Sequence, residues 1–260
     1  MNIMLRNVFL ITGASRGLGL ELVKQLCNCD KSLNKLKPST ILATCRNPEK
    51  ASELQEVSKS NAEKVIVKKL DVADFASYSE FVKTIEPIVE KTGINCLINN
   101  AGISPKSTRY TMVNVEQMAD TFKTNAIAPL MFSREMLPFL KKAADNNSIE
   151  SLIVNMSSIL GSVELNHPES GGGSGGGIYP YRSSKAALNM ITRSLSLDLK
   201  HINTKAVAIH PGWVKTDMGG SHAPLTTEKS IFGVLSVINN FSSESHNGKL
   251  IDYTGKILPF

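Results

Sequence analysis

The sequence is poor in the residues that build cross-linked or metal-bound scaffolds. Its 260 residues include only four cysteines, none of them in a CxxC pair. Structural zinc sites and disulfide frameworks need cysteines at characteristic spacings, so the sequence indicates neither. His210 and His167 also lack a second histidine or carboxylate at ligand spacing, and we expect no metal. Free thiols suit a reducing compartment, and we expect a cytoplasmic protein.

Long apolar runs are missing as well. No stretch approaches the roughly 20 apolar residues of a membrane-spanning helix, and the amino terminus lacks the apolar region and cleavage site of a signal peptide. The net charge is +6, but lysine and arginine are scattered, and aromatic residues make up only 6% of the chain. A basic stripe with interleaved aromatics is typical of nucleic-acid binding. The sequence therefore predicts neither a membrane nor a nucleic-acid partner.

What the chain does contain is the repeating pattern of an α/β domain. Its length and its 42% hydrophobic content suit a single domain over residues 1–260. Short apolar runs alternate with segments of helical period, which is typical of βα units wound onto a parallel sheet. We expect strands at Val8–Thr12, Thr40–Thr44, Val65–Leu70, Cys96–Ile98, Leu152–Met156, Ala206–His210 and Lys249–Tyr253, and helices near 17–28, 48–60, 74–91, 114–143, 180–200 and 226–240. The pattern predicts a doubly wound Rossmann-type fold, with about seven parallel strands and helices on both faces.

Three segments depart from this pattern. Residues 28–39 lengthen the connection before the second strand, and we expect a surface loop there. Residues 161–180 form a glycine-rich loop around the run GGGSGGG from Gly171 to Gly177, whose composition is that of a flexible coil. Residues 215–227 are rich in small side chains and would suit a lid over a substrate, with a passive surface loop as the alternative.

A nucleotide site is predicted where the first strand ends. The segment TGASRGLG follows a strand-like run and opens a helix, which is the context of a phosphate-binding glycine loop. Gly13 and Gly17 would permit a tight turn, Gly19 would allow close packing, and the helix amino end would face a pyrophosphate. The expected cofactor contacts in this loop are Gly13, Ser15, Arg16, Gly17, Leu18 and Gly19. A glycine turn that binds nothing is the alternative.

The end of the second strand bears on the choice of cofactor. In folds of this kind an acidic residue there binds the ribose 2′-hydroxyl of NAD. Here the segment reads ATCRNPEK, with Arg46 in place of an acid, and Arg16 lies in the glycine loop. Two guanidinium groups suit a 2′-phosphate, so the sequence favours NADPH/NADP+ over NADH. The alternative is that either arginine only faces water.

The segment YRSSK places Tyr181 and Lys185 four residues apart, on the same face of a predicted helix. A positive charge beside a phenol lowers the pKa of the phenol and makes it a better general acid near neutral pH. A surface tyrosine with a solvated lysine is the alternative for such a pair taken alone.

These motifs occur together and in order. Between the glycine loop and the carboxyl terminus follow NNAG at residues 99–102, KTNA around Asn125, NMSS at 155–158, YRSSK, and PGWVKTDM at 211–218. Over essentially its whole length the chain resembles the classical short-chain dehydrogenase/reductase family. Within that family it is most similar to the sniffer-like and C-factor-like carbonyl reductases.

The resemblance implies a catalytic set. Ser158 would orient the substrate carbonyl, Tyr181 would donate a proton, and Lys185 would bind the ribose while it tunes Tyr181. Hydride would come from a nicotinamide. Asn125 would hold a water that connects Lys185 to solvent. Because asparagine is a poor residue for a helix interior, we also expect some local feature to compensate for Asn125.

The resemblance implies further contacts with the cofactor and the substrate. Asp71 would accept a hydrogen bond from the adenine. The other expected nucleotide contacts are Val72, Asn99, Ala101 and Gly102, followed by Pro211, Gly212, Val214 and Thr216 along the nicotinamide. Trp213 and Met218 would lie near the substrate entrance.

Two residues compete with the catalytic pair. Ser157 stands beside Ser158, but the family pattern places the catalytic serine second. Tyr179 stands near Tyr181, but its spacing of six residues from Lys185 puts it elsewhere on the helix. The connection from Ser158 to Tyr181 is longer than the family pattern because it contains the glycine-rich segment.

The sequence therefore predicts an NADPH-dependent carbonyl reductase, whose small-molecule substrate is an aldehyde, ketone or quinone. One alternative is a specialised reductase of a steroid or pteridine carbonyl. Another is a sensor or signalling protein that binds NADPH and turns over little. The family commonly pairs subunits through the helices that correspond to residues 114–143 and 180–200, so the resemblance also implies a homodimer.

Overall fold

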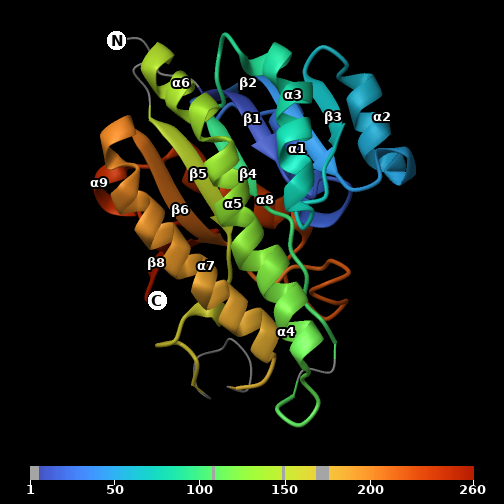
Figure 1. Ribbon diagram of the computed structural model, residues 1–260, viewed down its shortest axis with the longest axis vertical. Coiled ribbons are helices and arrows are strands. Elements are labelled where there is room, and N and C mark those ends of the chain that lie inside the picture. Colours follow the sequence, from blue (N-terminus) through green and yellow to red (C-terminus); the bar gives the residue numbers. More distant parts are fainter. Residues whose placement is uncertain (1–5, 107–108, 148–149, 168–175) are drawn as a thin grey trace.

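The computed structural model describes residues 6–106, 109–147, 150–167 and 176–260, and within these ranges the chain forms one sheet of eight strands (Figure 1). The strand order is β3-β2-β1-β4-β5-β6-β7-β8, with β8 antiparallel and the other strands parallel. The strands are β1 (Arg6–Ile11), β2 (Leu36–Cys45), β3 (Val65–Lys69), β4 (Cys96–Asn99), β5 (Ser151–Met156), β6 (Thr204–His210), β7 (Leu250–Asp252) and β8 (Ile257–Leu258). The order reverses between β1 and β4, where a doubly wound sheet binds its ligand. The predicted Rossmann-type fold is confirmed.

The strand β2 begins earlier than predicted. It starts at Leu36, so residues 36–39 of the expected loop belong to the sheet. Pro38 lies in this part of β2, where the pairing with β1 shifts register between Arg6 and Val8. A proline has no N–H to donate to a neighbouring strand and is therefore uncommon inside a sheet, so Pro38 does not indicate a strand in the sequence.

The strand β8 was not predicted. It is only two residues long and pairs with β7 across a tight turn. The Asp252 carboxylate holds the turn by accepting hydrogen bonds from the backbone N–H groups of Thr254 and Lys256, at 2.9 and 3.0 Å. Gly255 supplies the positive φ angle that the turn requires.

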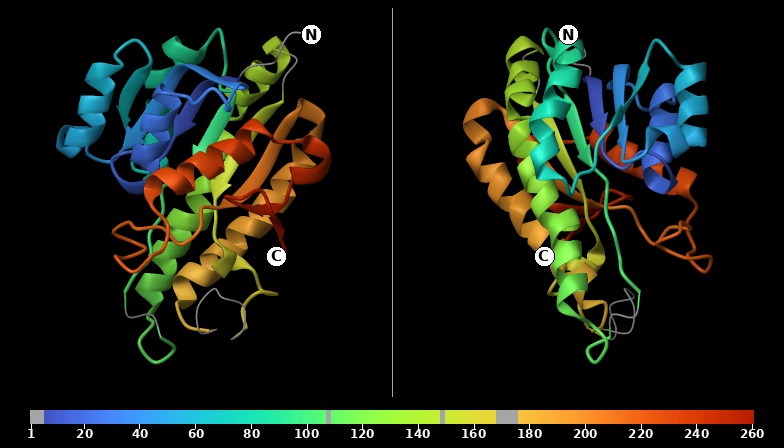
Figure 2. Two further views of the ribbon diagram at one scale, coloured as in Figure 1. Left: turned by 180° about the vertical axis from the view of Figure 1, so that it is seen from behind. Right: turned by 45° about the vertical axis from the view of Figure 1, so that its right-hand side comes forward.

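Helices cover both faces of the sheet (Figure 2). On one face lie α1, α2 and α8, and on the other lie α3, the run from α4 to α6, and α7. Each face has an apolar core: Leu22 and Ile231 are fully buried on the first, and Phe132 and Leu140 on the second. The α-helices are α1 (Gly17–Cys27), α2 (Ser52–Ser60), α3 (Tyr78–Val89), α4 (Val115–Phe122), α5 (Ala128–Glu135), α6 (Leu137–Asn147), α7 (Tyr179–Asp198), α8 (Thr227–Asn239) and α9 (Ser243–His246). The shorter turns are η1 (Pro48–Lys50), η2 (Phe75–Ser77), η3 (Lys123–Ile127), η4 (Ile159–Gly161) and η5 (Lys200–Ile202).

The single helix predicted over residues 114–143 is divided. The helix α4 runs into the π-helical turn η3 and then into α5, and α6 begins anew. Pro138 explains the second break, because a proline ring clashes with the carbonyl four residues before it and donates no hydrogen bond. The first break contains Asn125, whose side chain is bonded outside its own helix.

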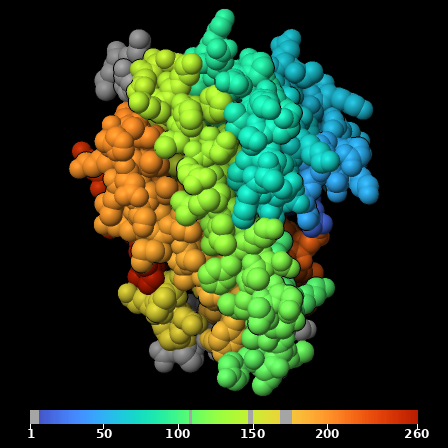
Figure 3. Space-filling model, in the orientation of Figure 1, coloured from blue at the N-terminus to red at the C-terminus, as the bar shows by residue number. Residues whose placement is uncertain are grey.

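The loops that follow β1, β4, β5 and β6 lie at the edge formed by the carboxyl ends of the parallel strands. In Figure 1 the amino ends of α4 and α7 extend beyond this edge, toward the bottom of the view. Figure 3 shows the run from α4 to α6 and α7 side by side on the face toward the viewer. Within the described ranges, no helix is both long and apolar enough to cross a bilayer.

Candidate active site

The loop after β1 has the backbone that its glycines predict. Gly13 and Gly17 have positive φ angles of 68° and 55°, which glycine adopts without strain. A side chain at Gly19 would run into the Gly13 carbonyl, and a Cβ at Gly13 would lie 2.8 Å from the Cα of Ala101. The glycines therefore let the loop turn sharply, let α1 pack against it, and bring it against the loop after β4.

Thr12 and Asn100 join these two loops, and the sequence did not single them out. The Asn100 Nδ2 donates to the carbonyls of Thr12 and Gly13 at 2.9 and 3.2 Å. In return, the Thr12 hydroxyl accepts from the backbone N–H groups of Asn100 and Ala101 at 3.0 and 3.1 Å. The second asparagine of NNAG therefore fixes the glycine loop at the point where the strand order reverses.

The amino end of α1 fits a phosphate group. Its N-cap residue, Arg16, makes no capping hydrogen bond with its side chain. N–H groups in the first turn of a helix, together with the helix dipole, favour an anion there. Ser15 and Leu18 are half-buried on either side of Arg16 and Gly17.

Two arginines are predicted to bind the 2′-phosphate. Arg46 follows β2 directly and is exposed, and no acidic residue lies within β2. Arg16 is exposed too, but its Nη1 lies 3.1 Å from Oδ2 of Asp217, in the loop after β6. The two cations that suit a 2′-phosphate are available, and one of them has an acidic partner that the sequence did not indicate.

The predicted adenine contacts lie after β3 and β4. Asp71 and Val72 follow β3, and the Asp71 carboxylate accepts a hydrogen bond from the Ala73 N–H at 2.9 Å. Val72 and Ala101 line one small cavity together with Thr12. The loops after β1, β3 and β4 therefore meet around this small cavity.

Asn99 has a buried, hydrogen-bonded side chain. Its side chain is 4% exposed, and its Nδ2 donates to the Ser133 hydroxyl at 3.0 Å and to Asn155 Oδ1 at 2.8 Å. Asn155 in turn donates to the Thr192 hydroxyl at 2.8 Å. This buried chain ties β4 and β5 to α5 and α7. The Asn99 side chain therefore supports the core, which leaves the backbone of Asn99 to make the predicted ribose contact.

Ser158 and Tyr181 meet at the carboxyl end of β5. Ser158 is 5% exposed and accepts a hydrogen bond from the Leu160 N–H at 3.1 Å, which caps η4. Tyr181 lies in the first turn of α7. Burial raises the pKa of Tyr181, and its hydrogen bond with Ser158 offsets part of that rise. The phenol is therefore protonated at neutral pH, as a proton donor must be.

Lys185 lies one turn further along α7. Its Nζ is 5.6 Å from the centre of the Tyr181 ring and donates to the Met156 carbonyl at 2.7 Å. Burial lowers the pKa of Lys185 to about 8. The sequence predicted a lowered pKa for Tyr181, whereas the net direction in this structure is upward because burial of the phenol has the largest effect.

Asn125 is fully buried in the π turn η3. Its Oδ1 accepts from the Ile103 N–H at 2.9 Å, and its Nδ2 donates to the Ile103 carbonyl at 2.8 Å and to the Ser184 hydroxyl at 3.1 Å. These bonds are the expected compensation for an asparagine inside a helix. A Cβ at Gly102 would lie 3.3 Å from Asn125 Oδ1 and 3.8 Å from Lys185 Nζ. Asn125 thus ties the loop after β4 to α7 beside Lys185.

The two competing residues lie elsewhere. The Ser157 hydroxyl donates to Asn189 Oδ1 at 2.6 Å, so it is turned toward the middle of α7. Tyr179 is 40% exposed, and its ring lies 6.1 Å from that of Tyr110 between centroids. This geometry favours Ser158 and Tyr181 over Ser157 and Tyr179.

The loop after β6 is held by its own hydrogen bonds. The Trp213 Nε1 donates to the Gly219 carbonyl at 2.8 Å, and the Thr216 hydroxyl accepts from the Gly219 N–H at 3.0 Å. Val214 pairs with Leu225 in a single bridge. These bonds fold most of the predicted lid, residues 215–227, into a closed turn. Of the contacts predicted here, Pro211 and Val214 are buried, Gly212 and Thr216 are half-buried, and Trp213 and Met218 are exposed.

The glycine-rich segment 161–180 is described only in part. Residues 168–175, which include most of the run Gly171–Gly177, lie outside the described residues. Gly161 lies against the backbone of Lys185, since a Cβ there would be 2.6 Å from the Lys185 carbonyl carbon.

The histidines were considered in the sequence as metal ligands. Burial lowers the pKa of His210 to about 4, so His210 is neutral at physiological pH. Among the described residues, no group of three histidine, cysteine or carboxylate side chains is close enough to hold a metal ion.

The model of the short chain dehydrogenase family matches residues 7–224. The chain belongs to this family. Its members are oxidoreductases, so the family resemblance seen in the sequence is confirmed and the coarse class of activity is set.

Solved structures resemble this short-chain dehydrogenase over almost its whole length. The carbonyl reductase Sniffer of D. melanogaster is 42% identical, with a TM-score of 0.89, and the match covers 98% of this chain and 99% of that one. An NADPH-bound carbonyl reductase from chicken fatty liver is 35% identical, with a TM-score of 0.88 and the same coverage of 98% and 99%. The C-signal of Myxococcus xanthus is 40% identical over 64% of this chain and 93% of its own length.

Proposed function

We propose that this short-chain dehydrogenase is an NADPH-dependent carbonyl reductase that converts an aldehyde, ketone or quinone into the alcohol or hydroquinone. Its main support is the placement of Ser158 beside the Tyr181 phenol, whose pKa it lowers, with Lys185 next to the ring, at the edge where the glycine loop lies. Similarity to two carbonyl reductases, one of them NADPH-bound, also supports the proposal.

The chain offers groups for each part of the cofactor. The glycine loop and the amino end of α1 would hold the pyrophosphate, and Arg16 and Arg46 the 2′-phosphate. Asp71 would bind the adenine. The backbone and side chains along the nicotinamide would come from Pro211, Gly212, Val214 and Thr216. When bound, NADPH supplies the hydride.

The catalytic residues supply the proton and orient the carbonyl. Ser158 and Tyr181 would both donate hydrogen bonds to the carbonyl oxygen, and Tyr181 would pass its proton to that oxygen. The Lys185 ammonium would stabilise the resulting tyrosinate and bind the ribose. Asn125, which fixes the loop beside Lys185, would hold the water through which the proton is replaced. Trp213 and Met218 would border the substrate entrance.

We test this proposal by measuring NADPH oxidation with a panel of quinones, aromatic aldehydes and ketones, and by comparing Tyr181→Phe with Tyr179→Phe. Both substitutions remove one phenol hydroxyl from the start of α7. We expect Tyr181→Phe to lower kcat by at least a hundredfold with NADPH affinity retained, since general-acid catalysis contributes about 10²–10⁴-fold. Tyr179→Phe should stay within about twofold of the parent protein, because its ring is exposed and packs near Tyr110.

Three results would contradict the proposal. If NADPH does not bind, the nucleotide site is misassigned. If it binds but no carbonyl in the panel is reduced, the sensor alternative is favoured. If Tyr181→Phe remains active, the proton comes from another group.

We also propose that the protein is a homodimer in the cytoplasm. On α7 the side chains of Met190 and Leu197 are 66% and 60% exposed. They are seven residues apart and so lie on one side of the helix. Large exposed apolar side chains grouped in this way suit a contact between subunits.

A further inference from the structure

The proposed proton transfer depends on how two parts of the chain are held together. The segment Met156–Gly161 leaves β5 and carries Ser158, while α7 carries Tyr181 and Lys185. The two parts touch directly, since the Lys185 Nζ donates to the Met156 carbonyl at 2.7 Å and Gly161 packs against the Lys185 backbone. Contacts between the segment and the helix therefore bear on the alignment of the two hydroxyls.

Asn189 makes two of these contacts. It lies on α7 one turn beyond Lys185, and its side chain is 2% exposed. Its Oδ1 accepts the Ser157 hydroxyl at 2.6 Å, and its Nδ2 donates to the Gly161 carbonyl at 3.2 Å. The two bonded groups stand on either side of Ser158 in the chain. One side chain of the helix thus clasps both ends of the turn that presents the serine.

This double contact needs the amide group. Leaving a buried hydroxyl or carbonyl without a hydrogen-bond partner costs free energy. With an apolar residue at 189, the Ser157 hydroxyl and the Gly161 carbonyl would therefore have to shift to reach other partners. The asparagine amide carries both the acceptor that Ser157 needs and the donor that the Gly161 carbonyl needs. Displacement of either end would move Ser158 relative to Tyr181.

We propose that Asn189 is a positioning residue, which sets the alignment of Ser158 with Tyr181 by clasping the turn between Ser157 and Gly161. The inference rests on the proposed carbonyl reductase function. Asn189 contacts neither substrate nor cofactor in this scheme, and its effect passes through Ser158. A misplacement of about 1 Å in a catalytic group can cost a hundredfold in rate.

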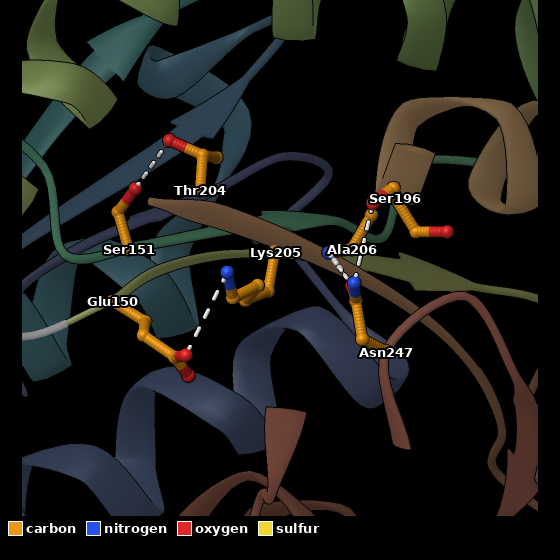
Figure 4. A network of polar contacts seen from close by, with 7 residues as sticks. All are labelled: Glu150, Ser151, Ser196, Thr204, Lys205, Ala206 and Asn247. Carbon is orange, nitrogen blue, oxygen red and sulfur yellow. Dashed lines mark hydrogen bonds and ion pairs between the residues drawn. The ribbon is translucent and has the colours of Figure 1, made fainter. Parts of the chain in front are cut away.

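The opposite end of α7 provides a matched control (Figure 4). There Asn247 donates from Nδ2 to the Ser196 carbonyl at 3.2 Å and accepts from the Ala206 N–H with its Oδ1 at 3.0 Å. It clasps α7 to β6 with two hydrogen bonds, as Asn189 clasps α7 to the turn after β5. Its neighbours in Figure 4, such as the ion pair of Lys205 with Glu150, lie at the amino ends of the strands. Asn247 therefore matches Asn189 in chemistry but not in place.

The experiment compares Asn189→Leu with Asn247→Leu in the full chain. For each variant we measure Tm, the Kd for NADPH by fluorescence, and kcat with the best carbonyl of the panel between pH 6 and 10. We expect both variants to melt at lower temperature. Asn189→Leu should lose at least tenfold in kcat, with the Kd for NADPH within about twofold of the parent. Asn247→Leu should keep kcat within about twofold.

The pH profile separates positioning from simple destabilisation. The hydrogen bond with Ser158 lowers the pKa of Tyr181. Poor alignment of that bond should therefore move the basic limb of the kcat profile to higher pH in Asn189→Leu, and leave it in place in Asn247→Leu. Ser157→Ala, a milder change, should lose at least threefold in kcat and move the profile the same way, and it replaces Asn189→Leu if that variant does not fold.

Equal loss of kcat in the two asparagine variants, or an unchanged kcat and pH profile in the Ser157 and Asn189 variants, would overturn the inference. Failure of the proposed function looks different. In that case the parent protein reduces no carbonyl, or Tyr181→Phe remains as active as the parent.

Discussion

At the scale of single residues, Arg16 has two possible partners. It is paired with Asp217 across the gap between the glycine loop and the loop after β6, and both side chains are more than 70% exposed, at 73% and 76%. An exposed pair of this kind contributes about 1 kcal/mol or less. A 2′-phosphate with two negative charges would compete with Asp217 for the same guanidinium group.

We therefore expect Asp217→Asn to lower the Kd for NADPH by about two- to fivefold at low salt, since Arg16 no longer has to leave a carboxylate. The Kd for NADH, which lacks the 2′-phosphate, should not change. Arg46→Ala is the reference and should weaken NADPH only. Fluorescence titration gives all of these values. An equal change for both nucleotides would mean that Asp217 acts on another part of the cofactor.

At Lys185, burial of the charge lowers the stability of the fold, while the proposed role of the residue is in activity. Its folded pKa of about 8 lies below the ordinary value of 10.5, so below pH 8 the charged side chain destabilises the fold, by about 3 kcal/mol. The cost fades as the pH rises from 8 to 10.5. We expect Lys185→Met to raise Tm at pH 7 without added nucleotide, despite the lost hydrogen bond to Met156. The rise in Tm should be smaller at pH 10.

Thermal melts of Lys185→Met at the two pH values measure this, with the exposed Lys83→Met as the control for loss of one charge. A lower Tm for Lys185→Met at pH 7 would show that its hydrogen bond outweighs its burial. The variant should also lose turnover, which would make Lys185 a residue kept for activity against stability.

The residues of the site were predictable where motif and backbone agree. Gly13, Gly17 and Gly19 have the turn and the packing expected of them. The direction of the Asn99 side chain was not predictable, because side chains alternate along a strand and the sequence does not give the phase at its end. Asn99 points into the core, and its neighbour Asn100 joins the loops. The pKa of Tyr181 was missed because burial is a property of the assembled site.

At the scale of elements, α7 and the turn after β5 touch at Gly161. A Cβ at this position would lie 2.6 Å from the Lys185 carbonyl carbon, and neither backbone segment can yield easily. We expect Gly161→Ala to destabilise the fold by about 1–3 kcal/mol, as overpacking does, and to lower kcat at least tenfold. Gly255→Ala has open space around it and should cost only the strain of its positive φ.

Denaturant unfolding and steady-state kinetics measure both glycine variants. If Gly161→Ala keeps the parent kcat, α7 and the turn can move apart without a change in activity. The contact at Gly161 would then contribute to stability only.

The elements were predicted best where their period is strong and local. The buried parallel strands β4, β5 and β6 lie close to their predicted places, since apolar runs of this length fit few other structures. The π turn could not be predicted, because it accompanies the bonds of Asn125 to Ile103 and Ser184, far away in sequence. The strand β8 is too short for any period.

At the scale of the whole molecule, the exposed side of α7 predicts assembly. We expect the protein to sediment as a dimer at micromolar concentration, and the double substitution Met190→Glu with Leu197→Glu to sediment as a monomer, because two charges would be buried in the contact. Glu53→Lys on α2, across the sheet, is the control and should stay dimeric. Sedimentation velocity distinguishes the species, and a monomeric parent protein would contradict the prediction.

The order of the strands also governs how the sheet can be assembled during synthesis. After β1 leaves the ribosome, β2 can pair with its free edge, and β3 with the edge of β2. The strand β4 then pairs with the other side of β1, and each later strand extends that side. No strand has to push between two that are already paired. The sheet can therefore grow outward from β1 as the chain is made, with the half that carries the glycine loop formed before β5, which Ser158 follows, emerges.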